Sequence, residues 1–492
     1  GMCEEGEESG DGPVQDRFVP LRGGAWDLGF VGTRLPHRAA AERDVPVARE
    51  SREEDKEGQD QAQKGLPRWL SWLYRPGFSK AANRNNPKGA VMLQGFDWES
   101  MREEVRGKHY TMLAGQMKNL AAAGVSVVWF PPPSSSADEQ GYLPGKWYEI
   151  PHKASLRSAI SAAERHGVVS MVDVVLNHRT ATKISKSTND WTAFEKPDWG
   201  EWAIVSDDWK CKPDDQIKFC PDNCTCGAVD TGENACYAPD IDHTNKRVQA
   251  DVSQWLLWLR KHIGFQAFRF DNTKGYAAHF TAQYIFASNP WMSVGEYFDT
   301  NRGLIEGWLK GAKMASKLFD FGLRYKLKDS IQGDDYTPLT DEWFGPMISY
   351  AKEQSVTFLD NHDTAGDLND RFGTEAQIEQ GYAFLLTHPG VPCIFWQDWV
   401  GPLQETLKTL LDVRKKAKIH SQSSWKVQLA QKGLYAGFVD DTLAIKLGTG
   451  AWSPNSGLAT RMWEGVANGN GWAVWMKMSR EDLAKAAKLA AA

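Results

Sequence analysis

Acidic, basic and imidazole side chains stand together where several apolar runs of the sequence end. These runs are VVSMVDVVLNH, FQAFRFD, WMSVGE and VTFLDNHD, and each ends in polar residues. Carboxyl groups beside a guanidinium and imidazoles are able to act as nucleophiles and as general acids or bases. The candidate residues are Asp173, Asn177, His178, Arg269, Asp271, Glu296, His362 and Asp363.

Arg269 and Asp271 form the first candidate pair. They are two residues apart in a predicted strand, so both side chains point to the same face of the sheet. A guanidinium beside a carboxyl group keeps that group ionised, and the nucleophile of a glycosidase must be ionised. On these two residues alone, a structural ion pair beneath a loop is the favoured explanation.

Glu296 and the DNHD run, which ends at Asp363, supply further carboxyl groups. Glu296 follows an apolar strand and faces other carboxylates, so it should be hard to ionise. A general acid needs that property, since it must hold its proton near neutral pH. A surface glutamate paired with a lysine, or a turn with Asx caps, would account for each site singly. Their recurrence at successive strand ends favours an active site.

The elements that must position these groups alternate along the chain. Helical spacing of apolar residues is found at 110–124, 156–167 and 247–264, and apolar strands lie between such segments. Eight strands, enough to close a barrel, are expected at 90–96, 125–130, 168–176, 265–271, 291–298, 318–324, 356–363 and 391–397. We therefore predict an α/β fold, a (β/α)8 TIM barrel, whose active site lies at the carboxyl ends of the strands.

The length of 492 residues exceeds the roughly 250 at which a single core stops growing, so several units are expected. Residues 1–85 are polar and charged, which predicts a largely disordered N-terminal extension. The barrel is assigned to 86–411, with an inserted domain at about 179–243 where the alternation stops. Residues 412–478 predict a C-terminal antiparallel β domain, with strands near 425–431, 434–440, 442–448 and 471–477, and 479–492 a helical tail.

Composition narrows the class of partner. The formal net charge is −6, so there is no basic excess to bind nucleic acid. No window reaches the ~18 apolar residues of a membrane helix, and the first thirty residues contain no apolar stretch typical of a secretory signal. We therefore expect neither a nucleic-acid nor a membrane partner.

The chain resembles the α-amylase family, glycoside hydrolase family thirteen, and within it the plant and algal type. The resemblance covers about residues 88–477. The segments that carry it are QGFDWES, QGYLPG, DVVLNHR, DTGENACYAPDIDH, FRFDNTKGY, GEYF, TFLDNHDT and THPGVPCIFW. Their number and order make the match specific, although each is weak alone. The resemblance implies endo-acting, retaining hydrolysis of α-1,4 bonds in starch and related α-glucans. A transglycosylase or exo-acting glucosidase on the same fold, and a non-catalytic starch-binding protein, are the alternatives.

The resemblance also implies a role for each matched residue. Asp271 is similar to the family's nucleophile, Glu296 to its general acid and base, and Asp363 to its third carboxylate, which grips sugar hydroxyls. The residues that match substrate-binding positions are Tyr142, His178, Arg269, Lys274 and His362. Asn272 stands where the family has an aromatic residue.

A calcium ion is a further implication of the resemblance, because in the family one ion ties the inserted domain to the barrel. The matching ligands are Asn177, Asp230, Asp240, and Glu233 and Gly275 through their carbonyl groups. Oxygen ligands from separate segments suit this hard cation. The implied partner is a polysaccharide (starch or maltooligosaccharides), and we expect a monomer. The sequence does not fix the compartment and favours a plastid or the cytosol only weakly.

Five of the seven cysteines crowd into the inserted segment, with the spacing C-x8-C-x3-C-x-C-x9-C from Cys211 to Cys236. The family does not explain this cluster. Free thiols, disulfides and a zinc site are all compatible with it. We favour at least one disulfide, because a small insertion with few apolar residues has little core of its own.

Overall fold

The computed structural model describes residues 88–484, apart from 187, 212–216, 222–223, 341–344, 367 and 458–461. The expected N-terminal extension at 1–85 and the end of the tail lie outside the described residues. Of that tail, 480–484 are helical. Within the described part of the chain, no helix is long and apolar enough to cross a membrane.

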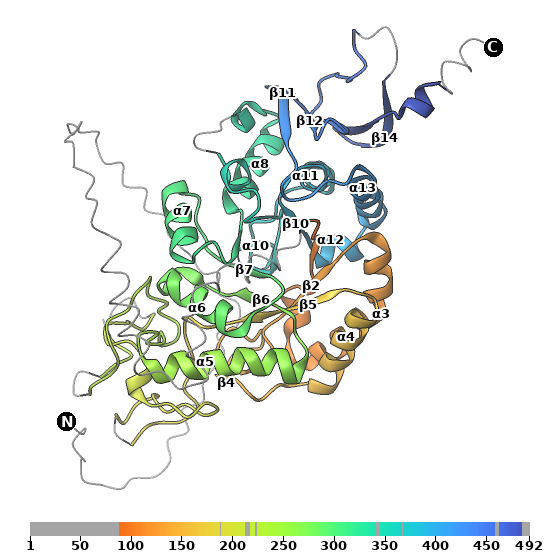
Figure 1. Cartoon of the computed structure of the whole chain (residues 1–492). Coiled ribbons are helices and arrows are strands. Elements are labelled where there is room, and N and C mark those ends of the chain that lie inside the picture. Colours follow the sequence, from red (N-terminus) through yellow and green to blue (C-terminus); the bar gives the residue numbers. More distant parts are fainter. Residues whose placement is uncertain are drawn as a thin grey trace, which may run out of the picture.

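Eight parallel strands close into a barrel (Figure 1), which confirms the predicted fold. The order around the barrel is β1-β10-β9-β8-β7-β6-β5-β2, and every neighbouring pair is parallel. Their bounds are β1 Met92–Gln94, β2 Val127–Phe130, β5 Val169–Val174, β6 Ala267–Phe270, β7 Ser293–Gly295, β8 Lys317–Phe319, β9 Ser355–Thr357 and β10 Val391–Phe395. Nearly all of these residues are buried, as expected for strands that are covered on both faces.

Helices surround the barrel and bury apolar stripes against it (Figure 1). They are α3 Glu103–Ala123, α4 Lys153–Arg165, α5 Lys246–Trp258, α6 Ala278–Ser288, α7 Arg302–Gly311, α8 Phe321–Gly333, α9 Met347–Tyr350, α10 His362–Ala365, α11 Glu375–Thr387, α12 Trp396–Val400 and α13 Gln404–Ala417. Short 3-10 turns are η3 Glu99–Met101, η4 Glu201–Ala203, η6 Thr273–Gly275 and η7 Thr337–Thr340, and a π-helical turn, η5 Leu259–Ile263, prolongs α5. Gly124 and Gly264 end α3 and η5 with φ of 101° and 110°, a conformation that glycine adopts without strain.

The insertion lies between β5 and α5, where the sequence predicted it, and contains mainly isolated bridges rather than long strands. A two-stranded sheet, β3 Ser135–Ser136 with β4 Pro144–Lys146, lies in the preceding β2–α4 connection. Buried Arg179 anchors the start of the insertion. Its guanidinium donates to the carbonyl groups of Gly145, Glu195 and Pro197. It also lies over the rings of Trp147, Phe194 and Trp199 at 4.8–5.2 Å.

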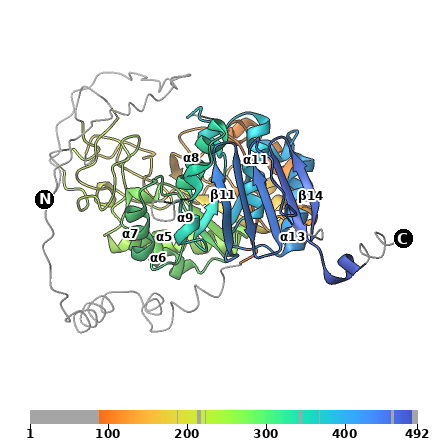
Figure 2. The same cartoon turned by 90° about the horizontal axis from the view of Figure 1, so that it is seen from above.

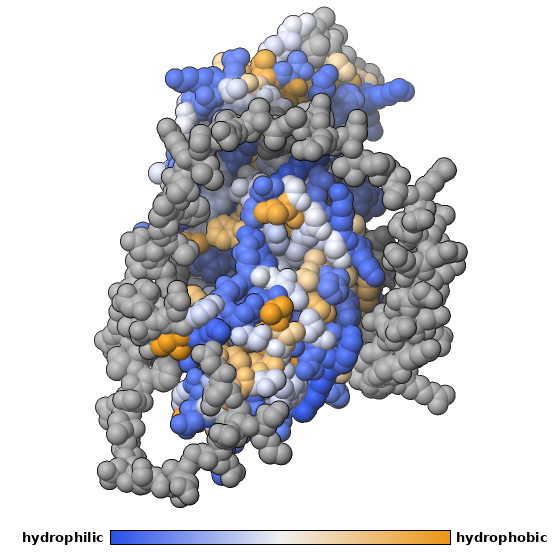
Figure 3. All heavy atoms as spheres, turned by 90° about the vertical axis from the view of Figure 1, so that its left-hand side faces the viewer, coloured by the Kyte–Doolittle hydropathy of each residue, from blue (hydrophilic) through white to orange (hydrophobic). Residues whose placement is uncertain are grey.

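The side of the molecule that carries the insertion is mostly hydrophilic (Figure 3). Hydrophobic residues on that face occur in small, separate groups rather than in one continuous patch.

The C-terminal unit is a five-stranded antiparallel sheet in the order β11-β12-β13-β15-β14 (Figure 2). Its strands are β11 Trp425–Gln431, β12 Leu434–Val439, β13 Leu443–Leu447, β14 Trp463–Gly469 and β15 Trp472–Lys477. Four of them match the expected segments, and β14 was not predicted because two glycines and an asparagine weaken its strand pattern. Helix α13 runs across the boundary expected near residue 412, so the sheet begins only at Trp425.

Candidate active site

Arg269 lies at the centre of a cluster of carboxyl groups at the carboxyl ends of the barrel strands. Its Nη1 is 2.9 Å from Oδ1 of Asp173 and 2.5 Å from Oδ1 of Asp271, and its Nη2 is 2.8 Å from Oε2 of Glu296. The arginine is 1% exposed, so these ion pairs are shielded from water. The structure thus brings the predicted pair Arg269 and Asp271 into direct contact with Glu296.

Glu296 has the environment of an acid that retains its proton. Burial is the main cause that raises the pKa of this carboxyl group, and the charge of Asp271 raises it further, against the opposing effect of Arg269. The backbone N–H of Asn272 donates to Oε2 of Glu296 at 3.0 Å, and Glu296 shares a side-chain hydrogen bond with Asp271. Two carboxyl groups in such contact favour a state in which one is protonated and one is ionised.

Asp363 completes the predicted set of three carboxyl groups. Burial, followed by the charge of Glu296, raises its pKa well above the usual range. Its Oδ1 lies 3.4 Å from Nε2 of His362, and its Oδ2 accepts a hydrogen bond from the Asn361 amide at 3.4 Å. Asp363 therefore belongs to the same electrostatic cluster without contacting Arg269 directly.

Asp173 on β5 holds neighbouring side chains of the site in place through hydrogen bonds. It accepts hydrogen bonds at Oδ2 from Tyr142 Oη at 2.9 Å and from Trp129 Nε1 at 3.1 Å. Burial raises its pKa to about 7, although the adjacent Arg269 guanidinium opposes the shift. These bonds fix the tilt of the Tyr142 ring as well as the position of Arg269.

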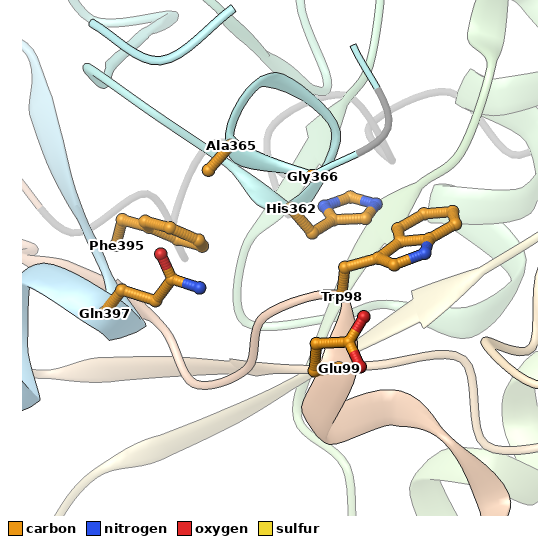
Figure 4. A pocket seen from close by; sticks show the side chains of 7 residues that line it. All are labelled: Trp98, Glu99, His362, Ala365, Gly366, Phe395 and Gln397. Carbon is orange, nitrogen blue, oxygen red and sulfur yellow. The ribbon is translucent and has the colours of Figure 1, made fainter. Parts of the chain in front are cut away.

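A stack of aromatic rings forms one wall of the site. The Tyr142 and His362 rings are nearly parallel, with centroids 5.1 Å apart, and Trp98 stacks on His362 at 6.1 Å. Figure 4 shows the Trp98 and His362 rings side by side in a cavity of about 360 Å³. Gln94 at the end of β1 hydrogen-bonds Nδ1 of His362 at 3.0 Å, and burial lowers the pKa of His362 well below its usual value. The imidazole is therefore neutral.

His178 and Lys274 occupy the side of the site next to the insertion. Nε2 of His178 hydrogen-bonds the carbonyl oxygen of Tyr142 at 2.7 Å, and burial lowers the pKa of His178 to about 4. Lys274 Nζ instead pairs with Glu233 at 3.1 Å and with Asp299 at 3.0 Å. Lys274 thus joins the barrel to the insertion and makes no direct contact with the three carboxyl groups.

The predicted metal ligands Asn177, Asp230 and Asp240 lie close to Asp208, in a group that we call the acidic cluster. Asn177 Nδ2 donates to Oδ1 of Asp240 at 2.7 Å, and the Asp240 N–H donates to Oδ2 of Asp208 at 2.9 Å. Burial, followed by the charge of Asp208, raises the pKa of Asp240 to about 9. Burial also raises that of Asp208 to about 7.

Three oxygens of this cluster are buried and have no hydrogen-bond partner among the described residues: Asn177 Oδ1, Asp208 Oδ1 and Asp230 Oδ2. Gly275 lies against the same amide, since a Cβ added there would be 1.8 Å from Asn177 Oδ1. The N–H of Glu233 donates to the Lys274 carbonyl at 3.0 Å, which brings the backbone carrying the two predicted carbonyl ligands together. These oxygen donors fit a hard cation such as calcium.

No group of three or more His, Cys, Asp or Glu side chains with the arrangement of a metal site occurs in the described part of the chain. The fit of the acidic cluster to a cation therefore rests on unpartnered amide and carboxyl oxygens together with backbone carbonyl groups.

Two disulfides, Cys211–Cys236 and Cys220–Cys226, cross-link the insertion, which confirms the prediction of at least one. The first closes a loop that includes Asp230, and Cys236 lies four residues before Asp240. The disulfides thus constrain the same segment that supplies the acidic cluster.

Some residues of the site were not predicted. Gln94 and Trp98 come from the end of β1 and the loop after it, and the QGFDWES motif was the only signal for them. Asp208 and Tyr237 come from the insertion, where the chain has no regular period from which a spatial arrangement could be predicted.

Comparison with known proteins shows the family to which the chain belongs. The model of the α-amylase C-terminal β-sheet domain matches residues 416–476. Probable α-amylase 2 of Arabidopsis thaliana is 32% identical over 414 residues, which cover 79% of this chain and 94% of that protein. The chain belongs to the α-amylase family. The chloroplastic α-amylase 3 of the same plant is 29% identical over 406 residues, 78% of this chain but 44% of that longer protein.

Solved structures of the α-amylase family show the same fold at low sequence identity. An α-amylase from Malbranchea cinnamomea superimposes with a TM-score of 0.58 at 15% identity, covering 82% of this chain and 98% of that one. The α-amylase of Geobacillus thermoleovorans, complexed with acarbose, gives 0.57 at 15% identity, covering 75% and 92%.

Proposed function

We propose that this protein is an endo-acting α-amylase, which hydrolyses internal α-1,4 bonds of starch and related α-glucans with retention of configuration. The observation that carries the proposal is the contact of Asp271 and Glu296 with one buried guanidinium and with each other. Inverting glycosidases hold their two carboxyl groups roughly 6.5–9.5 Å apart to admit a water molecule, whereas retaining enzymes hold them closer. Membership of the α-amylase family supports the same reaction.

In the proposed mechanism Asp271 attacks the anomeric carbon while Glu296 donates its proton to the departing glycosidic oxygen. A glycosyl ester of Asp271 forms, and the leaving chain departs with that proton. Glu296, now ionised, removes a proton from water, which attacks the same carbon and releases Asp271. Arg269 positions the attacking carboxyl group, because its Nη1 lies 2.5 Å from Oδ1 of Asp271.

Asp363, His178 and His362 are proposed to bind the hydroxyl groups of the sugar at the cleaved bond, and Tyr142 to stack beneath its ring. Both histidines are neutral, because burial lowers their pKa values. They can therefore hydrogen-bond hydroxyl groups without adding positive charge next to the oxocarbenium-like transition state. Lys274 is proposed to act on the leaving-group side, from its position between Glu233 and Asp299.

Members of the α-amylase family generally depend on calcium. We propose that Asn177, Asp230 and Asp240, with the carbonyl groups of Glu233 and Gly275, hold a calcium ion here. The support is the set of buried oxygens without partners and the close packing of Gly275 on Asn177. A calcium ion held by these residues would supply positive charge between the insertion and the barrel. The proposed substrate is a polysaccharide, and the proposed active form is a monomer.

A product analysis tests this function. Purified protein is incubated with calcium and a maltoheptaoside blocked at its non-reducing end, and early products are resolved by chromatography and by NMR of the new anomeric centre. The proposal expects cleavage at internal bonds with α-configured products. Cleavage only of the unblocked substrate would indicate an exo-acting enzyme, and longer products a transglycosylase. No cleavage of either substrate would favour a non-catalytic protein.

A further inference from the structure

Tyr237 is an exposed aromatic residue beside the catalytic carboxyl groups to which the proposed mechanism gives no role. It comes from the insertion and is 49% exposed. Its ring lies edge-on to the His178 ring with centroids 4.8 Å apart, and its hydroxyl group hydrogen-bonds the side chain of Asn272. Burial of the hydroxyl group and the charges of Asp271 and Glu296 raise its pKa, so the phenol stays neutral.

The position of Tyr237 relative to the cleaved bond follows from Asn272. The Asn272 side chain binds Tyr237, and its backbone N–H donates to the carboxyl group of Glu296 at 3.0 Å. Glu296 is the proposed proton donor to the leaving group. Tyr237 therefore lies on the side of the site where the leaving chain departs, and the Trp98–His362–Tyr142 stack forms a separate wall.

The backbone of Tyr237 is held on both sides. Before it, Cys236 is linked by a disulfide to Cys211, and the Cys211 N–H donates to the Cys236 carbonyl at 2.7 Å. After it, the Arg179 N–H donates to the Pro239 carbonyl at 3.1 Å. Both flanks of Tyr237 are thus tied to other segments, which fixes the point from which its side chain projects.

We propose that Tyr237 binds a sugar ring of the leaving chain by stacking, and that the Cys211–Cys236 disulfide positions Tyr237 for this contact. A glucose ring has an apolar C–H face, which suits a half-exposed aromatic ring that carries a polar group at its tip. The inference rests on the proposed function, because it names a subsite of the same active site.

Kinetics with two substrates test the role of the ring. Tyr237→Ala should raise KM for maltoheptaose about two- to tenfold, the range expected from one lost aromatic contact. KM for maltotriosyl fluoride should stay unchanged, because fluoride replaces the leaving sugar. Tyr237→Phe should keep most of the affinity, and Trp191→Ala, which removes a similarly exposed aromatic (48%) from the same insertion, should match wild type. Equal KM increases for both substrates, or none, would overturn the proposal.

A pair of cysteine variants tests the tether. Cys211→Ser with Cys236→Ser should reproduce the KM increase for maltoheptaose, whereas Cys220→Ser with Cys226→Ser should leave KM near wild type. Similar KM values for the two pairs would overturn the role of the Cys211–Cys236 bond. Binding of maltoheptaose to each variant in a Glu296→Gln background, measured by calorimetry, gives a second readout that does not depend on turnover.

These experiments separate the inference from the proposed function. Wild-type protein that fails to cleave either substrate would contradict the function itself. Wild-type protein that cleaves both, with Tyr237→Ala unchanged towards maltoheptaose, would contradict only the role of Tyr237.

Discussion

The catalytic cleft and the acidic cluster both concentrate buried carboxyl groups, but they neutralise these groups differently. In the cleft, Arg269 pairs with Asp173, Asp271 and Glu296. In the acidic cluster, Asp208, Asp230 and Asp240 form no salt bridge with any described residue, and three oxygens of the cluster remain unpartnered. The cleft thus contains its own counter-charge, whereas the described residues supply none to the acidic cluster.

This difference matches the role that we propose for each region. A catalytic site needs charges that are already in place when substrate arrives, because reorganising them would raise the barrier. A site that joins two parts of a chain can acquire its charge after those parts have come together, and binding then stabilises the folded state. Substitutions in the cleft should therefore affect mainly turnover, and changes in the acidic cluster mainly stability.

The largest expected effect is on turnover. Asp271→Asn and Glu296→Gln should each lower kcat at least about a thousandfold, since each removes several kcal/mol of transition-state stabilisation. Thermal unfolding should show that both variants remain folded. A variant that keeps more than about a tenth of wild-type kcat, a barrier change of under 1.4 kcal/mol, would refute its assigned role.

Arg269→Met is the exception among cleft substitutions, because it should lower the stability of the fold as well as turnover. It would leave three buried carboxyl groups without their cation, a change that typically costs about 3–5 kcal/mol of folding free energy. Urea unfolding would measure this loss. Arg157→Met on the exposed face of α4 is the matched control and should change stability by less than about 0.5 kcal/mol. An Arg269→Met variant as stable as this control would contradict the central role of Arg269.

Calcium removal should lower stability through the acidic cluster. A free concentration a hundredfold above Kd stabilises the folded state by about 2.7 kcal/mol. Chelation should therefore lower the melting temperature, and added calcium should restore it. Asp240→Ala should abolish the response, whereas Glu296→Gln in the cleft should retain it. A calcium response that survives in Asp240→Ala would place the ion elsewhere.

The smallest effect concerns pH. Burial and the charge of Asp271 raise the pKa of Glu296, and the acid is active only when protonated. Activity should be present below that pKa and lost as pH rises through it, by about tenfold for each further pH unit. A profile of kcat/KM against pH for maltoheptaose would show this alkaline limb. Maltotriosyl fluoride, whose leaving group needs no proton, should lack the limb, and its presence there would assign the limb to another group.

Much of this arrangement could be predicted from the sequence, because strand ends have a local signature. Arg269, Asp271, Glu296 and Asp363 each follow an apolar run, and the closure of parallel strands brings such ends to one rim of a barrel. Once the eight strands were recognised, the meeting of these side chains followed from topology.

The remaining features depend on contacts that no local pattern encodes. Asp208 contacts Asp240 only because the insertion folds back on itself. Tyr237 lies beside the cleft because Asn272 bonds its hydroxyl group and the Cys211–Cys236 disulfide holds the backbone before it. The β14 strand was missed because Gly465 and Gly469 lower its strand propensity, while pairing with β15 supplies the stabilisation that the sequence pattern lacks.

Arg179 limits where the insertion can be exchanged between related barrels. Its guanidinium bonds carbonyl groups both from the β2–α4 connection, at Gly145, and from the insertion, at Glu195 and Pro197. Trp199 in turn donates to Asp251 on α5 at 2.8 Å. A chimaera joined just after His178 would take Arg179 from the donor protein and its partner Gly145 from the recipient, and the two need not match in sequence or position. A graft that keeps native residues through Trp199 would preserve that interface, so the natural crossover point lies about twenty residues inside the insertion.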